Sequence, residues 1–473
     1  MRLDVIVAHY DLVIIGTGSG NSLLDSRFAG WRVAVVERGV FGGTCLNVGC
    51  IPTKMFVHAA DLASVPAAAA RLGVDETLDG VRWPAIRDRI FGRIDPIADS
   101  GRKYRMAHPD NANVDVYLGA ARFVGERRLE ITPNDGSPAE TVTADRIVLA
   151  AGGRAVVPEI EGIHDVGFHT SDTVMRLDEL PRRLVILGSG FVAAEFAHVF
   201  SAFGVEVTVV ARSGALLRGE DRDISLRFTQ LAQQCWDVRL DRKAVLAERA
   251  GDGVRLHLEG PDGAETVEGD LLLVAVGRTP NADLLAVEEG GIAVAPTGHV
   301  MVDEFQRTSA DGVWALGDIS SPWELKHVAN HEARIVQHNL LNPGRLRAAD
   351  HRFVPHAVFT APQIASVGLT EQDAERGDAR WVAATEAYSG VAYGWAMEDT
   401  TGFAKILADP ATGQILGGHI IGPQAPTLLQ PIIQAMSFGL DARSMARGQY
   451  WIHPGLPEVV ENALLNLPLD PVD

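Results

Sequence analysis

Two of the three cysteines in this 473-residue chain, Cys45 and Cys50, are separated by four residues in a glycine-containing turn that leads into a predicted helix. A pair with this spacing could close a small disulfide ring. A helix N-terminus lowers the pKa of a nearby thiol and favours the reactive thiolate, and Pro52 suits the first turn of such a helix. The segment therefore indicates thiol–disulfide chemistry.

A cysteine pair can also bind a metal ion or simply crosslink a loop. The third cysteine, Cys235, is remote in the sequence, and the chain has no second cysteine pair with zinc-finger spacing, which disfavours a metal site. We expect Cys235 to be an inert helix residue. A structural crosslink in a flavin-containing scaffold or electron-transfer protein stays open as the alternative to a redox-active pair.

Two glycine-rich turns are the next candidate functional elements in the sequence. Each follows a short apolar strand and precedes a helix-like stretch and a second strand, which is the first half of a dinucleotide-binding fold. The first glycine permits the tight turn, the second lets the backbone approach a pyrophosphate, and the following helix N-terminus offers free N–H groups to the phosphates. The motif positions are Gly16, Gly18 and Asn21 in the first turn and Gly188, Gly190 and Ala193 in the second.

The residues that follow each unit indicate which coenzyme it binds. Glu37 ends the second strand of the first unit, where a carboxylate accepts hydrogen bonds from ribose hydroxyls. The corresponding place in the second unit is Ala211, followed by Arg212 and Arg218, and two guanidinium groups suit the 2′-phosphate of NADPH. Asn21 departs from the usual third glycine and is expected to loosen helix–strand packing there.

Composition excludes several classes of function. The chain has 61 acidic and 42 basic residues, for a formal net charge of -19, which disfavours nucleic-acid binding. Apolar runs such as Leu271–Val276 are far shorter than the ~18 residues of a membrane span. The N-terminus shows no signal-peptide pattern, and three cysteines do not make a disulfide scaffold. We therefore expect a cytoplasmic protein without nucleic-acid or membrane partners.

The thirteen residues from Gly42 to Lys54 resemble the redox motif of the pyridine nucleotide-disulfide oxidoreductases, and the resemblance extends over essentially the whole chain. It implies an α/β fold with two Rossmann-like dinucleotide-binding domains, for FAD and NADPH, and a C-terminal α+β dimerisation domain. Further matching stretches are Tyr117–Ala121 around Gly119, Val276–Asn281 around Gly277, Leu316–Asp318, Leu325–Arg334 and, in part, Ala150–Gly153.

The same resemblance implies domain boundaries and roles. The FAD domain would comprise residues 1–155 and 280–344, the NADPH domain residues 156–279, and the dimerisation domain residues 345–473. Cys50 would face the flavin as the charge-transfer thiolate, and Cys45 would attack the substrate disulfide. Asp318 would hold the ribityl chain of FAD. Lys54 and Glu195 would form a buried ion pair beside the reactive flavin nitrogen.

The segment His453-Pro454-Gly455-Leu456-Pro457-Glu458 resembles the family's acid–base motif. His453 would act on the cysteines of the partner subunit in a homodimer, and Glu458 would orient its ring. A histidine suits this task because its pKa lies near neutrality. For His198 and His356, among others of the 15 histidines, we expect structural roles.

The expected substrate is a low-molecular-weight disulfide. Family members that act on mercuric ion or thioredoxin carry an extra C-terminal cysteine or selenocysteine pair, and this chain has no cysteine after Cys235. A single-cysteine site would suit an NADH oxidase or peroxidase, and the pair argues against one. Asn21 and the segment Tyr450–Glu458 resemble the mycothione-reducing members more than the glutathione-reducing ones. Mycothione is thus the expectation, with glutathione disulfide or a lipoyl group as alternatives.

Overall fold

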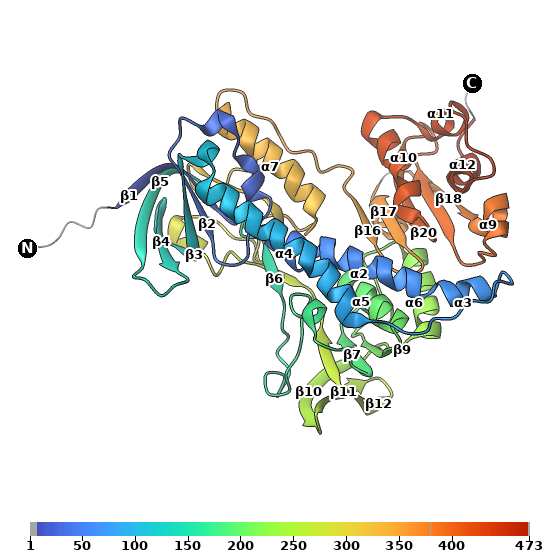
Figure 1. The fold of residues 1–473 in the computed structure, drawn as a ribbon. Coiled ribbons are helices and arrows are strands. Elements are labelled where there is room, and N and C mark those ends of the chain that lie inside the picture. The colour runs from blue at the N-terminus through green and yellow to red at the C-terminus, as the bar shows by residue number, and fades with distance from the viewer. Residues whose placement is uncertain (1–6, 379, 472–473) are drawn as a thin grey trace, which may run out of the picture. The chain divides into compact units, whose positions relative to one another are not determined.

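The computed structural model describes residues 7–378 and 380–471 (Figure 1). The chain divides into two compact units, each assembled from three stretches of sequence. Unit 1 comprises Met1–Thr53, Arg87–Val156 and Gly277–His351, and unit 2 comprises Lys54–Ile86, Val157–Val276 and Arg352–Asp473.

Unit 1 is built on a parallel sheet in the order β3-β2-β1-β5-β15. One more strand, β4, pairs antiparallel with both β3 and β5 and forms a second layer. β6 and β14 make a separate antiparallel pair. The bounds are β1 Ala8–Ile15, β2 Val33–Glu37, β3 Val114–Gly125, β4 Arg128–Pro133, β5 Glu140–Leu149, β6 Gly153–Ala155, β14 Arg278–Pro280 and β15 Val313–Ala315.

Strand β3 belongs to both layers. Its first part, from Val114 to Leu118, pairs parallel with β2, and its second part, from Gly119 to Gly125, pairs antiparallel with β4. A Cβ on Gly119 would lie 2.4 Å from the carbonyl oxygen of Thr132. The absence of a side chain at Gly119 therefore lets the strand change partners without a clash.

Both faces of the parallel sheet are buried, as the continuous apolar strands predict. Leu12 and Ile14 of β1 pack with Val336 and Leu340 of helix α7 (Lys326–Leu341). Val13 and Ile15 point the other way, into a cluster with the antiparallel layer. The alternation of side chains along β1 thus divides the core of unit 1 into two clusters.

The expected helix after the first glycine-rich turn does not form. Two short 3-10 segments, Gly20–Leu23 and Ser26–Phe28, replace it. Asp25 lies between them in an extended conformation, and its carboxylate accepts a hydrogen bond from Arg27 N and pairs with the Arg27 guanidinium. Such local side-chain hydrogen bonds compete with helical ones, which explains the interruption.

Helices α1 to α4 lie between β2 and β3 in the sequence. Their bounds are α1 Gly43–Asn47, α2 Cys50–Ala63, α3 Val65–Ala70 and α4 Trp83–Ala107. Ala70, the last residue of the alanine run 67–70, also ends helix α3.

Unit 2 contains the second dinucleotide-binding sheet, parallel and in the order β13-β7-β8-β9. An antiparallel meander, β10-β11-β12, packs with it in one core cluster. The bounds are β7 Arg183–Leu187, α5 Phe191–Ala202, β8 Glu206–Val210, α6 Arg222–Cys235, β9 Asp237–Arg239, β10 Lys243–Ala250, β11 Gly253–Gly260, β12 Gly263–Gly269 and β13 Leu271–Val274.

The C-terminal part of unit 2 is a five-stranded antiparallel sheet, β16-β17-β20-β19-β18, with helices packed on it. In Figure 1 it runs from orange to red. The predicted fold class, two dinucleotide-binding domains followed by an α+β domain, is confirmed. The bounds are β16 Pro355–Val358, β17 Ile364–Gly368, α8 Glu371–Arg376, β18 Val382–Ala387, α9 Ala392–Ala396, β19 Phe403–Ala408, β20 Ile415–Ile421, α10 Ala425–Phe438, α11 Ala442–Arg447 and α12 Pro457–Leu465.

None of the helices within residues 7–378 and 380–471 combines the length and the hydropathy that a membrane span requires.

Candidate active site

Cys45 and Cys50 lie on two short helices that meet at Gly49. Cys45 is in α1 and Cys50 is the first residue of α2. A Cβ on Gly49 would lie 2.9 Å from the carbonyl oxygen of Thr44 and 3.2 Å from the Cα of Cys45. Glycine is therefore required for the close approach of the two helices. Both cysteines are free thiols in this structure, joined by a hydrogen bond.

The surroundings make Cys45 the better nucleophile of the pair. The hydrogen bond from Cys50 lowers the pKa of the Cys45 thiol, burial opposes the shift, and the Lys326 ammonium and the backbone N–H groups of Ile51 and Cys50 lower it further. The same hydrogen bond, with burial, raises the pKa of Cys50. Because Cys50 holds the shared proton, the thiolate forms on Cys45. Although Cys45 is in α1, its thiolate faces the backbone N–H groups at the N-terminus of α2, which stabilise it.

Lys326 is a site residue that the sequence analysis missed. It opens helix α7, and its Nζ donates to Ser19 Oγ at 2.8 Å, which places its charge beside the first glycine-rich turn. Lys326 is one of only a few lysines in an arginine-rich chain, a signal that could have drawn attention to it.

The first glycine-rich turn has the shape that a dinucleotide requires. Gly16 has a φ of 102°, and a Cβ there would lie 2.3 Å from the carbonyl oxygen of Ala150, which follows strand β5. Only glycine is compatible with both conditions. A Cβ on Gly18 would make an ordinary 3.7 Å contact with Gly43 Cα, so the turn lies directly against the start of α1.

The packing that Asn21 was expected to loosen is secured in another way. The guanidinium of the buried Arg105 donates to Asn21 Oδ1 and to the Asn21 carbonyl oxygen, each at 3.0 Å. Gly20 supplies the close approach, because a Cβ there would lie 2.8 Å from the Ala150 Cβ. The role of the third glycine is therefore shifted by one residue, and the expectation of looser packing at Asn21 was wrong.

Glu37 and Asp318 complete a set of groups that fits FAD. Glu37 follows the first turn at the end of β2, and its carboxylate accepts from Thr17 N at 2.9 Å and from Gly39 N at 2.7 Å. Asp318 follows β15, and burial raises the pKa of its carboxyl group. Parallel strands present their carboxyl ends at one edge of a sheet. Phosphates, ribose hydroxyls and a ribityl chain are the groups that such a set binds.

The second glycine-rich turn repeats the first. Gly188 has a φ of 144°, and a Cβ there would lie 2.1 Å from the carbonyl oxygen of Ala275, which follows β13. Gly190 is the N-cap of α5 and has open space where its side chain would be, and Ala193 is buried within that helix. Gly277, in unit 1, has a φ of 135° and accepts a hydrogen bond from Val156 N.

Arg212 and Arg218 are exposed in the loop between β8 and α6. Within residues 7–378 and 380–471, neither guanidinium forms an ion pair with a carboxylate. Two unpaired arginines beside a glycine-rich turn are suited to an incoming phosphate group.

Lys54 and Glu195 converge on a third residue, Phe359. The Lys54 Nζ lies 3.9 Å from the centroid of the Phe359 ring, and the Phe359 N–H donates to Glu195 Oε1 at 2.9 Å. Burial lowers the pKa of Lys54, while the carboxylates of Asp61 and Glu195 oppose that shift. Phe359 was not singled out from the sequence, because an aromatic residue after a strand carries no distinctive signal.

The His453 side chain is exposed, and one of its two ring nitrogens is held by a hydrogen bond. Its Nδ1 lies 2.8 Å from Glu458 Oε1, and Glu458 Oε2 accepts from Gly455 N at 3.0 Å. These hydrogen bonds, from Gly455 and then from His453, lower the pKa of Glu458. With Nδ1 engaged, Nε2 is left to exchange a proton with a substrate. His453 and Glu458 belong to unit 2, whereas Cys45 and Cys50 belong to unit 1.

The chain belongs to the pyridine nucleotide-disulphide oxidoreductases. The model of this family matches residues 10–333, and the model of the family's dimerisation domain matches residues 354–464. It is a disulfide oxidoreductase that uses FAD and NADPH.

Individual relatives span nearly the whole chain. Mycothione reductase of Mycobacterium tuberculosis (strain H37Rv) is 56% identical over 97% of this chain and 99% of its own. Mercuric reductase of Streptomyces lividans is 33% identical over 93% of this chain and 92% of its own. Among solved structures, the flavoprotein disulfide reductase RclA of Escherichia coli superposes with a TM-score of 0.83 at 29% identity, covering 97% of this chain and 99% of its own.

Proposed function

We propose that this enzyme reduces mycothione to mycothiol at the expense of NADPH. The observation that carries the substrate is the 56% identity with a mycothione reductase over 97% of the chain. The chemistry is supported by the hydrogen-bonded pair Cys45 and Cys50, whose surroundings lower the pKa of Cys45. A nucleophilic thiolate beside a second thiol is what disulfide exchange requires.

The exchange uses both cysteines in turn. The Cys45 thiolate attacks one sulfur of mycothione, so that a mixed disulfide forms and one mycothiol leaves as a thiolate. His453 protonates that leaving group. Cys50 then attacks Cys45 Sγ, which releases the second mycothiol and leaves a Cys45–Cys50 disulfide. Two electrons and two protons are needed to restore the thiols.

Bound FAD would supply the transfer of electrons from NADPH to this disulfide. We assign the glycine-rich turns, the carboxylates Glu37 and Asp318 and the arginines to holding the two coenzymes. The FAD set is Gly16, Gly18, Glu37, Lys54, Gly119, Glu195 and Asp318. The NADPH set is Gly188, Gly190, Ala193, Arg212, Arg218 and Gly277.

We also propose that the enzyme acts as a homodimer in the cytoplasm. The match to a dimerisation domain over residues 354–464 supports the dimer. His453 of one subunit would serve Cys45 of the other. We retain the boundaries 1–155 and 280–344 for the FAD domain, 156–279 for the NADPH domain and 345–473 for the dimerisation domain.

The direct test is NADPH oxidation by purified, FAD-loaded enzyme with mycothione, glutathione disulfide and lipoamide in parallel. We expect turnover with mycothione only, and none in a Cys45→Ser control. Turnover with glutathione disulfide or lipoamide instead would overturn the substrate and keep the chemistry. Equal rates in the wild type and the control would mean that the cysteine pair is structural.

A further inference from the structure

The loop that carries Arg212 and Arg218 ends in three residues bound to the C-terminal sheet of the same unit. The first, Glu220, is buried. Its Oε1 lies 2.7 Å from His356 Nε2 on β16, and its Oε2 accepts from Ser366 Oγ on β17 at 2.7 Å. A buried carboxylate with two fixed partners holds its backbone in place.

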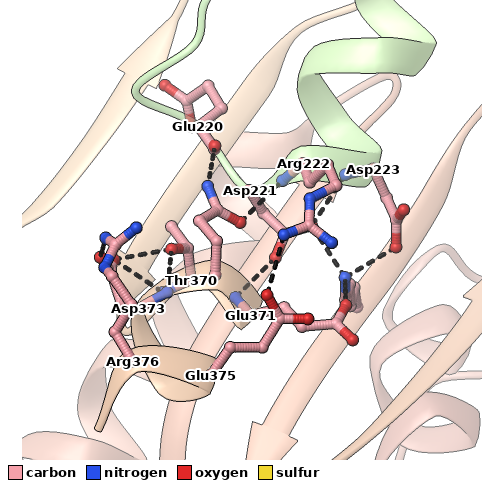
Figure 2. A network of polar contacts seen from close by, with 11 residues as sticks. Glu220, Asp221, Arg222, Asp223, Thr370, Glu371, Asp373, Glu375 and Arg376 are labelled. Atoms are coloured by element: carbon pink, nitrogen blue, oxygen red, sulfur yellow. Dashed lines mark hydrogen bonds and ion pairs between the residues drawn. The ribbon is translucent and has the colours of Figure 1, made fainter.

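The second residue, Asp221, meets the buried Lys405. Figure 2 shows Asp221 near the two other carboxylates of this cluster, Asp223 and Glu371. Lys405 Nζ, from β19, donates to Asp221 Oδ1 at 2.9 Å, to Asp223 Oδ2 at 2.7 Å and also to Glu371. Burial disfavours the charge, but the hydrogen bonds that the ammonium group donates to these three carboxylates raise the pKa of Lys405. The ammonium group fills the centre of a cluster whose spacing would otherwise suit a metal ion.

The third residue, Arg222, shares a partner with Glu220: the side chain of Gln372 binds the backbone of both. Gln372 Nε2 on α8 donates to the Glu220 carbonyl oxygen at 2.7 Å, and its Oε1 accepts from Arg222 N at 3.0 Å. One amide side chain thus binds the backbone on both sides of Asp221. In return, Asp221 Oδ2 accepts a hydrogen bond from Glu371 N, at the start of α8, at 2.9 Å.

The middle of the same loop is fixed to the dinucleotide-binding sheet and its helices. Leu217 N donates to the carbonyl oxygen of Ser189, which lies between Gly188 and Gly190, at 2.8 Å. Leu216 N donates to Thr229 Oγ1 at 2.9 Å, and Ser225 Oγ donates to the Leu216 carbonyl oxygen. The backbone is therefore held on both sides of Arg218, while its side chain remains exposed.

We propose that Gln372 and Lys405, both from the C-terminal sheet domain, are positioning residues for the 2′-phosphate of NADPH, acting through Glu220–Arg222 on the loop that carries Arg212 and Arg218. The inference rests on the proposed assignment of these two arginines to that phosphate. Preorganising a binding loop increases affinity because less freedom is lost when the ligand binds. The C-terminal domain would thus contribute to coenzyme choice as well as to dimerisation.

Gln372→Ala is the first test, because it removes two hydrogen bonds without leaving a buried charge. Binding of 2′,5′-ADP and of 5′-AMP to the FAD-loaded enzyme is measured by calorimetry, since these probes differ only in the 2′-phosphate. We expect about fivefold weaker binding of 2′,5′-ADP, from two neutral hydrogen bonds, and unchanged binding of 5′-AMP. The KM for NADPH is expected to rise by a similar factor with kcat preserved.

Lys405→Met and Lys405→Arg form a second pair. The methionine variant is expected to lose affinity for 2′,5′-ADP, and the arginine variant to regain part of it, because a guanidinium can also bind the three carboxylates. Asp441→Ala is the control: Asp441 caps α11 in the same domain through Arg443 N and Ser444 N, without any part in this network. It is expected to lower stability while leaving both affinities unchanged.

The outcomes separate the two proposals. If the wild type prefers 2′,5′-ADP and Gln372→Ala keeps that preference, the positioning role is overturned and the arginines stand. Equal loss of both probes in Gln372→Ala would reduce the network to general support of the fold and also overturn the positioning role. If the wild type binds both probes equally, the assignment of the arginines fails, and the positioning role fails with it.

Discussion

Gly43 and Gly18 face each other so closely that a Cβ on Gly43 would lie 2.7 Å from the Cα of Gly18. Gly43 opens the helix that carries Cys45, and Gly18 belongs to the first glycine-rich turn. The turn assigned to FAD and the helix assigned to the redox chemistry are thus in backbone contact. This contact depends on the absence of a side chain at Gly43, whereas a Cβ on Gly18 would make only an ordinary contact.

Gly43→Ala tests this contact. Gly43 has a φ of 68°, so the substitution introduces both backbone strain and a clash. We expect it to cost about 1–3 kcal/mol of stability and to reduce the FAD retained after purification, measured from the ratio of flavin to protein absorbance. Gly101→Ala, which places a methyl group in open space on α4, is the control. Full FAD content in Gly43→Ala would contradict the dependence.

The two cysteines should differ in their spectra. In Cys45→Ser, the remaining Cys50 thiolate should retain a long-wavelength charge-transfer band with the oxidised flavin, whereas Cys50→Ser should lack it. Both variants should lose disulfide turnover. Absorbance spectra of the two purified variants make the comparison, and the reverse pattern would exchange the assigned roles.

Alkylation of the reduced enzyme should report the lowered pKa of Cys45. A depressed pKa means that the thiolate persists to lower pH, so the rate with iodoacetamide should fall only as the pH drops below the ordinary cysteine range. Lys326→Met removes a positive charge that stabilises the thiolate and should move this inflection to higher pH. Lys103→Gln, at an exposed lysine paired with Asp99, should leave it in place. An unmoved inflection in Lys326→Met would remove Lys326 from the site.

Hybrid dimers test whether His453 acts across the subunit boundary. His453→Ala alone should lower disulfide turnover about 10²–10⁴-fold, because a positioned general acid is lost, while NADPH still reduces the flavin. A dimer of one His453→Ala subunit and one Cys45→Ser subunit, isolated with two affinity tags, should recover about half of wild-type turnover per dimer. Such recovery arises only if one intact site combines groups from both subunits, so an inactive hybrid would place His453 in its own subunit's site.

Removing either arginine should weaken the preference for NADPH. Arg212→Ala and Arg218→Ala should each raise the KM for NADPH about tenfold or more, since each removes charge-assisted hydrogen bonds, with the KM for NADH unchanged. Steady-state kinetics with both coenzymes makes the measurement. Arg182→Ala, at another exposed arginine of unit 2, should change neither value. An equal rise for NADH would show that the loop supports the adenine end in general.

Much of the site could be predicted because it depends on short-range sequence. The glycine-rich turns lie where the strand–turn pattern predicts, since the glycines at 16 and 188 each adopt a φ that other residues avoid. The cysteine pair also lies at the start of a helix as expected. The backbone geometry of these turns is determined by the residues within them, so the sequence motifs are enough to predict it.

What the sequence did not reveal depends on contacts between distant residues. Lys326 approaches Cys45 only because α7 packs on the sheet, and Gln372 meets Glu220 only because the C-terminal sheet meets α6. Asn21 was misjudged because Arg105, far along the chain, binds it. In each case an unremarkable residue type acquires its role from a partner that no spacing rule identifies.

Strand β15 pairs with β5 in the same sheet, although the whole of residues 157–276 separates them in the sequence. During synthesis, the ribosome releases β15 only after that entire intervening segment has emerged. The FAD sheet therefore still lacks its edge strand β15 when all the strands of the NADPH sheet have been synthesised. Stable capture of FAD is thus a late event in the biogenesis of this enzyme, after the second dinucleotide fold has become available to form.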